Sequence, residues 1–379
     1  MEDLEEAEDG WFFDSLTKYQ DLHMYQLEGP ANVLEWTSPQ TVCVAGQHGN
    51  SSQILELQLP LKLLVEVNKG LCAERDFRVT CGAFTDAPVS GLKHVTGTRC
   101  VVTSGGQSSD LQLWDLSEEA GGSIKSTGSV PGVTRHSGGG NIKMAVRPCM
   151  PEVVHGAQSD DVVLSSLTTG KTLSHHVLAP AAELLASLHF VSQDVVLAAC
   201  FNGSVYVMDT RASGPAQVHS QTAGDQWWTA VSAGSDLSSC ELIQLSGSGL
   251  AVIWDLRSPP ASKRHAQLDV QSISSDSEHV HVSWAPALDN TISVSGFGGN
   301  ILIYDSSNWG AEPHHVRPQF EHRGHMVSNG LTTPHSVMVT AHIWHTVRPR
   351  TLLSAASDGS AHLWDWISQS ATKESSDPH

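Results

Sequence analysis

The sequence is poor in basic residues. Its 379 residues include 21 Lys and Arg against 40 Asp and Glu, a net charge of −19 at pH 7 with histidine counted as neutral. Nucleic-acid affinity comes largely from Lys and Arg side chains that displace counterions from phosphates. The charge balance therefore argues against direct binding of RNA or DNA.

Features of a membrane or secreted protein are also missing. No apolar run approaches the roughly 20 residues that span a bilayer, and the first ten residues, MEDLEEAEDG, are the opposite of a signal peptide. The seven cysteines are an odd number and none forms a C-x-x-C pair. Buried, reduced thiols are therefore favoured over disulfides, and we expect a soluble cytoplasmic protein.

Catalytic motifs are absent as well. The chain has no G-x-S-x-G, H-E-x-x-H, Walker or complete G-x-G-x-x-G motif. Two histidine pairs stand three positions apart, in HRGH (322–325) and HIWH (342–345). On a strand such pairs point to opposite faces and cannot share a metal ion without a bend. We expect no enzyme activity, no metal and no cofactor.

What the sequence does contain is a repeat. Each copy begins with a strand that ends in small residues and continues with a glycine turn. An alternating strand follows, and it ends with an aromatic residue or Met followed by Asp. The clearest copies are AACFNGSVYVMDTR (198–211), LSGSGLAVIWDLR (245–257), SGFGGNILIYDS (295–306) and SDGSAHLWDW (357–366). In the last copy a further strand lies upstream, and Trp344, Ser354 and Trp364 are ten residues apart.

Seven repeat units can be aligned at one position near their ends. These positions are Gln58, Asp115, Ser166, Asp209, Asp255, Asp305 and Asp365. A unit of about four short strands cannot bury both of its faces alone, so the units must pack around a common axis. The chain resembles the WD-repeat β-propeller family over residues 23–367. That resemblance implies an all-β, seven-bladed propeller in which residues 23–29 supply the last blade's fourth strand, an N-to-C closure.

One unit carries the full set of hydrogen-bonding residues of a well-formed WD unit. By this resemblance, four residues of the unit form a buried structural tetrad: His325, Ser354, Asp358 and Trp364. The other units depart from the pattern; Asn202 and Gly298 stand at the turn-Asp position, and Met208 and Tyr304 at the Trp position. The propeller is therefore a degenerate one.

The segments outside the ring are the remaining candidates for function. Residues 1–10 form an acidic head and residues 368–379 a polar tail, both expected to be disordered. Residues 11–22 are predicted to form an amphipathic helix that docks on its own propeller, or alternatively on a partner. A second candidate for partner docking is LPLKLLVEV (59–67). For this segment the favoured interpretation is a long strand of a blade. The aromatic face of the helix comprises Trp11, Phe12, Phe13, Leu16 and Tyr19, and the acids of the head are Glu2, Asp3, Glu5, Glu6, Glu8 and Asp9.

Several stretches, most of which lie outside the WD core, resemble one particular family, that of WD repeat-containing protein 73. They include SLTKYQDLHMYQL, LQLPLKLLVEVNKGL, HRGH and AHIWHTVRPRTLLSAASD, in that order along the chain. The resemblance implies a cytoplasmic scaffold that assembles the metallo-β-lactamase-type RNA endonuclease heterodimer of the Integrator complex together with a further assembly factor. The acidic head would cover the nuclease active site.

The same resemblance implies an alternative, a regulator of microtubule organisation at the spindle pole and cleavage furrow. The acidic surface speaks against direct tubulin binding, because the exposed tails of tubulin are themselves acidic. Any microtubule link is therefore expected to be indirect.

Overall fold

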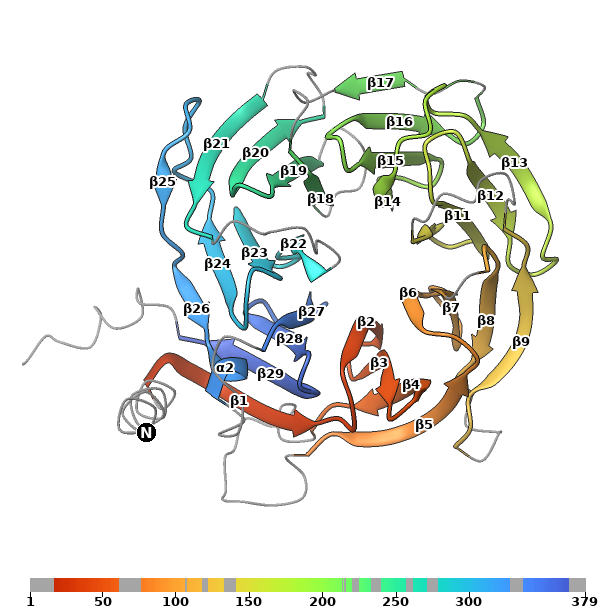
Figure 1. Cartoon of the computed structure of the whole chain (residues 1–379), viewed down its shortest axis with the longest axis horizontal. Helices are drawn as coiled ribbons and strands as arrows, with labels where there is room; N and C mark the ends of the chain where they lie inside the picture. The colour runs from red at the N-terminus through yellow and green to blue at the C-terminus, as the bar shows by residue number, and fades with distance from the viewer. Residues whose placement is uncertain are drawn as a thin grey trace, which may run out of the picture.

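Seven β-sheets stand around a central axis and form a closed ring (Figure 1). The computed structural model describes residues 17–60, 76–105, 108–117, 122–132, 141–212, 214, 216–219, 225–232, 240–256, 262–270, 279–327 and 337–367. Each sheet is one blade, with its first strand nearest the axis. The expected all-β, seven-bladed propeller is confirmed.

The first four blades each use four consecutive antiparallel strands. Blade 1 comprises β2 (Ala31–Ser38), β3 (Thr41–His48), β4 (Ser51–Gln58) and β5 (Arg78–Thr85). Blade 2 comprises β6 (Val89–His94), β7 (Cys100–Gly105), β8 (Leu111–Asp115) and β9 (Lys125–Val130). Blade 3 comprises β10 (Lys143–Val146), β11 (Glu152–Gly156), β12 (Val162–Ser166) and β13 (Thr172–His176). Blade 4 comprises β14 (Leu185–Phe190), β15 (Val195–Cys200), β16 (Val205–Asp209) and β17 (Ala216–His219).

The last three blades contain the irregular connections. Blade 5 comprises β18 (Trp227–Val231), β19 (Glu241–Ser246), β20 (Leu250–Asp255) and β21 (Ser262–Leu268), extended by the short parallel strand β25 (His315–Val316). Blade 6 comprises β22 (His281–Trp284), β23 (Thr291–Ser295), β24 (Ile301–Asp305) and β26 (Phe320–His322), followed by the one-turn helix α2 (Gly324–Val327). Blade 7 comprises β27 (Val339–Trp344), β28 (Thr351–Ala356), β29 (Ser360–Trp366) and β1 (Tyr19–Gln26). No helix of the described chain has the length and apolar character needed to cross a membrane.

The seven positions aligned in the sequence are structurally equivalent. Each lies at the end of its blade's third strand and pairs with the first residue of the second strand: Gln58 with Thr41, Asp115 with Cys100, Ser166 with Glu152, Asp209 with Val195, Asp255 with Glu241, Asp305 with Thr291, and Asp365 with Thr351. Aspartate suits this position because its carboxylate can accept a hydrogen bond from the backbone two residues on and so shape the turn. Ser117 donates such a bond to Asp115 at 2.9 Å, and Ser307 to Asp305 at 2.8 Å.

The hydrophobic core is divided among the seams between blades. Within the described chain there is one buried cluster at each of the seven seams. For example, Trp228 of blade 5 and Trp284 of blade 6 belong to one cluster, and Leu34 of blade 1 and Leu363 of blade 7 belong to another. Each blade thus buries both faces only because it has two neighbours.

The ring closes through pairing of the two ends of the chain. Strand β1 runs antiparallel to β29, from Tyr19 opposite Trp366 to Gln26 opposite Ser360. The N-to-C closure is therefore confirmed, but β1 begins four residues before the predicted residue 23. Thr17 and Lys18 are helical, but Tyr19 to Leu22 form a strand, so the predicted helix over 11–22 is wrong for these four residues; residues 11–16 lie outside the described residues. The open edge of β29 offers backbone hydrogen bonds that outweigh the helical side-chain pattern.

The long connection after blade 1's third strand is described only at its start. Strand β4 ends at Gln58, and Leu59 follows it as a buried residue whose backbone N–H donates to Gln40 O at 2.9 Å. The candidate segment 59–67 therefore does not continue the strand at residues 59 and 60, and residues 61–67 lie outside the described residues.

Arginines tie several blades together across the seams. Arg99 of blade 2 makes two hydrogen bonds to the carboxylate of Glu56 in blade 1, at 2.6 and 2.7 Å. Thr37 and Thr80 also donate to this carboxylate. Burial by itself would raise the pKa of Glu56, but the hydrogen bonds from Arg99, Thr80 and Thr37 outweigh it and hold that pKa below its ordinary value. Arg264 of blade 5 likewise donates to Asn290 of blade 6 at 2.9 Å.

Replacing Arg99 should destabilise the fold. Arg99→Met leaves the Glu56 carboxylate, which is 1% exposed, without its cationic partner, and should lower the free energy of unfolding by about 2–3 kcal/mol in a urea titration, since Arg99 itself is partly solvated. Arg323→Met removes the exposed pair with Glu321 and is the control, expected to change stability by less than about 1 kcal/mol. Equal effects of the two substitutions would contradict a special role for the buried pair.

Candidate functional site

The residues of the predicted tetrad meet inside blade 7. Ser354 Oγ lies 2.8 Å from Nε2 of His325 and accepts a hydrogen bond from Nε1 of Trp364 at 3.2 Å. Ser354 and Trp364 come from the adjacent strands β28 and β29, and His325 comes from helix α2. All three side chains are fully buried. The Ser354 hydroxyl therefore links strands β28 and β29 to helix α2.

Asp358 joins this unit through Ser360, a residue that the sequence pattern missed. Ser360 Oγ donates to Oδ1 of Asp358 at 2.6 Å and lies 2.7 Å from Nδ1 of His325. The backbone N–H of Ser360 donates to the same carboxylate oxygen at 2.9 Å. Gly359, between them, has a φ of +84° that favours glycine. The only sequence signal for Ser360 was its place two residues after the turn aspartate.

Two further histidines and a tyrosine extend the network to the closing strand. His322 hydrogen-bonds through Nδ1 to the hydroxyl of Tyr19 at 2.8 Å and through Nε2 to Nδ1 of His362 at 3.1 Å. The His322 ring also stacks on Trp364, with centroids 4.5 Å apart. Tyr19 belongs to β1 and His322 to β26. The network therefore links blade 6, blade 7 and the N-terminal strand, and we name these seven residues the closure network: Tyr19, His322, His325, Ser354, Ser360, His362 and Trp364.

The expectation that His322 and His325 point to opposite faces is wrong. Strand β26 ends at His322, and the one-turn helix α2 over Gly324–Val327 bends the chain so that the two rings lie 5.4 Å apart. Gly324 makes this possible, because a Cβ at that position would lie 2.8 Å from the rings of His322 and His362. His345, of the second pair, bonds instead to Pro39 O at 2.9 Å.

Nitrogen atoms of three histidines in the network lie close enough to raise the question of a metal ion. One nitrogen each from His322, His325 and His362 lies within 4.8 Å of the others. Both nitrogens of His325 and both of His322 already have hydrogen-bond partners. The rings of His325 and His362 are stacked, 3.9 Å apart and 8° from parallel. Lone pairs in parallel ring planes do not converge on one ion, so the geometry favours hydrogen bonding.

Burial keeps these histidines neutral. It lowers the pKa of His362 to about 4, and it holds the pKa of His325 and of His322 well below the usual range, with neighbouring histidines adding to the effect. At physiological pH each ring can therefore be donor at one nitrogen and acceptor at the other. This suits a structural network.

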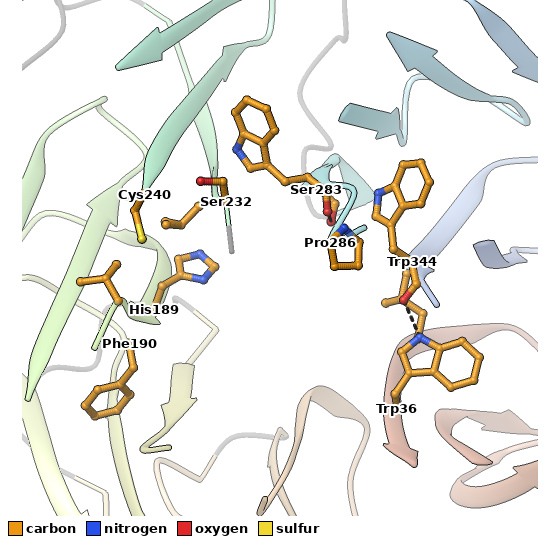
Figure 2. A pocket seen from close by; sticks show the side chains of 12 residues that line it. Trp36, His189, Phe190, Ser232, Cys240, Ser283, Pro286 and Trp344 are labelled. Carbon is orange, nitrogen blue, oxygen red and sulfur yellow. Dashed lines mark hydrogen bonds between the residues drawn. The ribbon is translucent and has the colours of Figure 1, made fainter. Parts of the chain in front are cut away.

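A pocket of about 450 Å³ opens near the axis of the ring (Figure 2). It is formed at the C-terminal ends of the first strands of five blades and by the residues that follow. Its lining is dominated by aromatic and aliphatic side chains, with a few uncharged polar groups: Trp36, His189, Phe190, Val191, Val231, Ser232, Cys240, Ser283, Trp284, Pro286, Ile343 and Trp344. No sequence pattern marks this pocket, since its residues are scattered over more than three hundred positions.

His189 is the histidine of this pocket, and it is a poor base. Burial, together with the nearby charge of Lys93, lowers the pKa of His189 to about 4, so its ring is a poor acceptor of protons at neutral pH. Ser232 Oγ accepts a hydrogen bond from the backbone N–H of Glu241 at 2.7 Å, and Ser283 Oγ donates to the carbonyl of Trp284 at 3.5 Å. The pocket is suited to burying an uncharged group.

Comparison with known proteins shows similarity along nearly the whole chain. A protein of Danio rerio named Integrator complex assembly factor WDR73 is 40% identical over 375 residues, covering 97% of this chain and 98% of that protein. The proteins of the same name from Homo sapiens and Mus musculus are each 34% identical, over 370 and 379 residues, covering 95% and 97% of this chain and 97% and 100% of those proteins. The chain belongs to the WDR73 family. No family model matches it.

Membership of the WDR73 family confirms the resemblance drawn from the sequence. Of the predicted docking residues, only Tyr19 is described, and it is 9% exposed, packed edge-on against Phe320 and Trp364. Tyr19 thus docks on its own propeller. The other candidate residues lie outside the described residues: Trp11, Phe12, Phe13 and Leu16 of the aromatic segment and Glu2, Asp3, Glu5, Glu6, Glu8 and Asp9 of the acidic head.

Loss of the Ser354 hydroxyl should destabilise the propeller. Ser354→Ala leaves His325 Nε2 and Trp364 Nε1 without their shared partner, which should cost about 1–3 kcal/mol in the free energy of unfolding. Asp358→Ala should act in the same direction and less strongly, because Asp358 acts through Ser360. Ser307→Ala, at an exposed serine of blade 6, is the control. Unchanged thermal stability in both Ser354→Ala and Asp358→Ala would contradict the role assigned to the tetrad.

Stability should also fall on mild acidification. The pKa of His155, His281 and His362 is lowered from the ordinary 6.5 to about 4 in the fold. Below pH 6.5 the unfolded chain therefore binds more protons than the folded one, and each such histidine removes up to about 1.4 kcal/mol per pH unit until pH 4. The melting temperature should drop steadily between pH 7 and pH 5, with a shallower slope for His362→Gln. A flat profile over this range would contradict the buried, neutral state of these rings.

Proposed function

We propose that the protein is a non-enzymatic assembly factor for the Integrator complex. The observation that carries the proposal is that four relatives with this role in their name match it at 32–40% identity over nearly their full lengths. Matches that cover 93–97% of this chain are long enough to take in most of the ring, so the scaffold is shared. An assembly factor acts by holding other proteins, for which a closed ring is suited.

Two features of the described residues support a scaffold. The ring is closed by β1 and braced by a buried network, so its surfaces keep a fixed geometry. The pocket near the axis has an apolar lining and a histidine whose pKa of about 4 makes it a poor base. These features support binding by preformed surfaces rather than chemistry.

The partners that fit best are the RNA endonuclease subunits of the Integrator complex. We propose that the protein binds this metallo-β-lactamase-type heterodimer in the cytoplasm, together with a further assembly factor, and covers its active site. A cleft that binds RNA is positively charged, and a chain of net charge −19 is electrostatically complementary to it. The acidic head, residues 1–10, is the densest negative segment and is the proposed covering element.

The microtubule alternative rests on the resemblance alone. No described feature favours it, and the excess of acidic residues is unfavourable for contact with the acidic tails of tubulin. We therefore advance only the Integrator role.

Co-expression with the two endonuclease subunits tests the proposal. The three proteins should elute as one complex, and the affinity should weaken as salt is raised from 50 to 300 mM, because screening acts on the charge attraction. RNA cleavage by the heterodimer should be inhibited in the complex. A chain lacking residues 368–379 is the control for a chain lacking residues 1–10. If loss of the head changes neither affinity nor inhibition, the head is not the covering element; absence of any complex would refute the proposed partner.

A further inference from the structure

The two faces of the ring differ in charge. On one face, which we name the hairpin face, the second strand of each blade turns into the third, and the chain passes from one blade to the next. On the opposite face, the strand-end face, the first strand turns into the second and the third strand ends. We propose that the hairpin face is the docking surface for the partner and accepts a positively charged protein surface. The inference rests on the proposed function for the identity of the partner and adds the place where it docks.

Acidic residues dominate the loops of the hairpin face. In the described parts of these loops there is one Lys or Arg, Arg323, and it is paired with Glu321 at 2.6 Å. Lys143, the first residue of β10, adds a cation on this side and lies over the ring of Phe201. Against these stand nine acids, contributed by loops all around the ring: Glu28, Asp86, Asp110, Asp160, Asp161, Glu183, Asp225, Asp269 and Asp358.

The loops of the strand-end face have a balance of the opposite sign. In the long connection from β24 to β26, which runs along blade 5 as β25, Glu312 and Arg317 balance each other. The other described loops contain more basic than acidic residues: Arg99, Arg147, Lys171, Arg211, Arg348 and Arg350 against Asp76, Asp194 and Asp289. The excess of acids in the described loops is therefore local to the hairpin face.

Carboxylates of the hairpin face bond to neutral groups. Glu183 accepts a hydrogen bond from the hydroxyl of Tyr206 at 3.0 Å. Asp225 accepts one from the hydroxyl of Ser248 at 3.2 Å. On the strand-end face, by contrast, Arg211 is paired with two aspartates. A neutral donor leaves the charge of a carboxylate in place, so the hairpin face keeps a negative potential that attracts an outside cation.

An apolar loop stands among these acids. The connection from β13 to β14 exposes Val177 and Leu184, which are 50% and 43% exposed. The buried side chain of Ser159 holds this loop against the hairpin of blade 3, because its Oγ donates to Ala181 O at 2.8 Å and accepts from the Glu183 N–H at 3.0 Å. Apolar side chains on a loop fixed in this way lose little entropy on binding. They suit a partner surface in which basic residues surround an apolar group.

Two triple variants of the full chain separate the effect of the face from that of the total charge. The hairpin-face variant combines Asp86→Asn, Asp225→Asn and Asp269→Asn; its matched control combines Asp76→Asn, Asp289→Asn and Glu312→Gln, and all six residues are exposed. Both variants have the same net charge, so their attraction for a distant basic partner is equal. With the endonuclease heterodimer in biolayer interferometry, the hairpin-face variant should bind about tenfold more weakly and depend less on salt, and the control should change by less than about twofold.

A second pair of variants tests the apolar loop. Val177→Ser with Leu184→Ser should weaken binding by about fivefold and leave its salt dependence unchanged, because no charge is lost. Met150→Ser with Val347→Ser changes two exposed apolar residues of the strand-end face. This matched control should bind as the unaltered chain does.

The outcomes distinguish failure of the docking surface from failure of the proposed function. Equal affinity of the two triple variants for the heterodimer overturns the docking surface while the partner stands. If the unaltered chain forms no complex, the proposed partner fails, and the fluorescein-labelled peptide KKGLKKGLKK replaces it; weaker binding by the hairpin-face variant than by its control then supports the surface, and equal binding overturns it. If the chain alone forms a dimer that the hairpin-face variant abolishes, the occupant is the strand-end face of a second copy, and the partner proposal fails.

Discussion

The pairing of β1 with β29 is the constraint on which the rest of the structure depends. A blade in this ring buries its two faces against two neighbours, so a single open seam leaves one side of a blade in water. Strand β1 covers the edge of the last blade and brings Tyr19 into the cluster between blades 6 and 7. Residues separated by more than three hundred positions must therefore meet before the ring is complete, which makes closure a costly late contact.

Closure explains why the most polar part of the interior lies where it does. Hydrogen bonds run from Tyr19 to His322 and on to His362, the ring of His362 stacks on His325, and His325 bonds to Ser354. This network sits at the seam that the N-terminal strand completes. Directional hydrogen bonds between neutral rings specify one arrangement of strand, loop and neighbouring blade, whereas hydrophobic contacts alone tolerate slippage. Blades with Met208 or Tyr304 at the Trp position lack the full pattern and rely on packing. The complete network is thus found where the order of strands is set by closure rather than by local hairpins.

The sequence allowed the ring to be predicted because its information is local and periodic. The third-strand ends, such as Asp305 and Asp365, recur once in every blade and are shaped by short-range turns. The details that escaped prediction are long-range. Tyr19 becomes a strand residue because of β29, His322 and His325 meet because α2 bends the chain, and the pocket joins ends of strands from five blades. No spacing rule within one segment contains these contacts, since each is a property of the assembled ring.

The charge of the protein and its pocket would act on a partner over different distances. A net charge of −19 attracts basic partners from beyond contact distance, but at physiological salt the attraction decays within about 8 Å and does not distinguish one basic surface from another. The pocket has no charged lining and contributes only at contact, where aromatic walls reward a matching apolar group. The rate of association would then depend on the surface charge, and the residence time would depend on the pocket. A partner that offers a basic surface without an apolar anchor would arrive quickly and leave quickly.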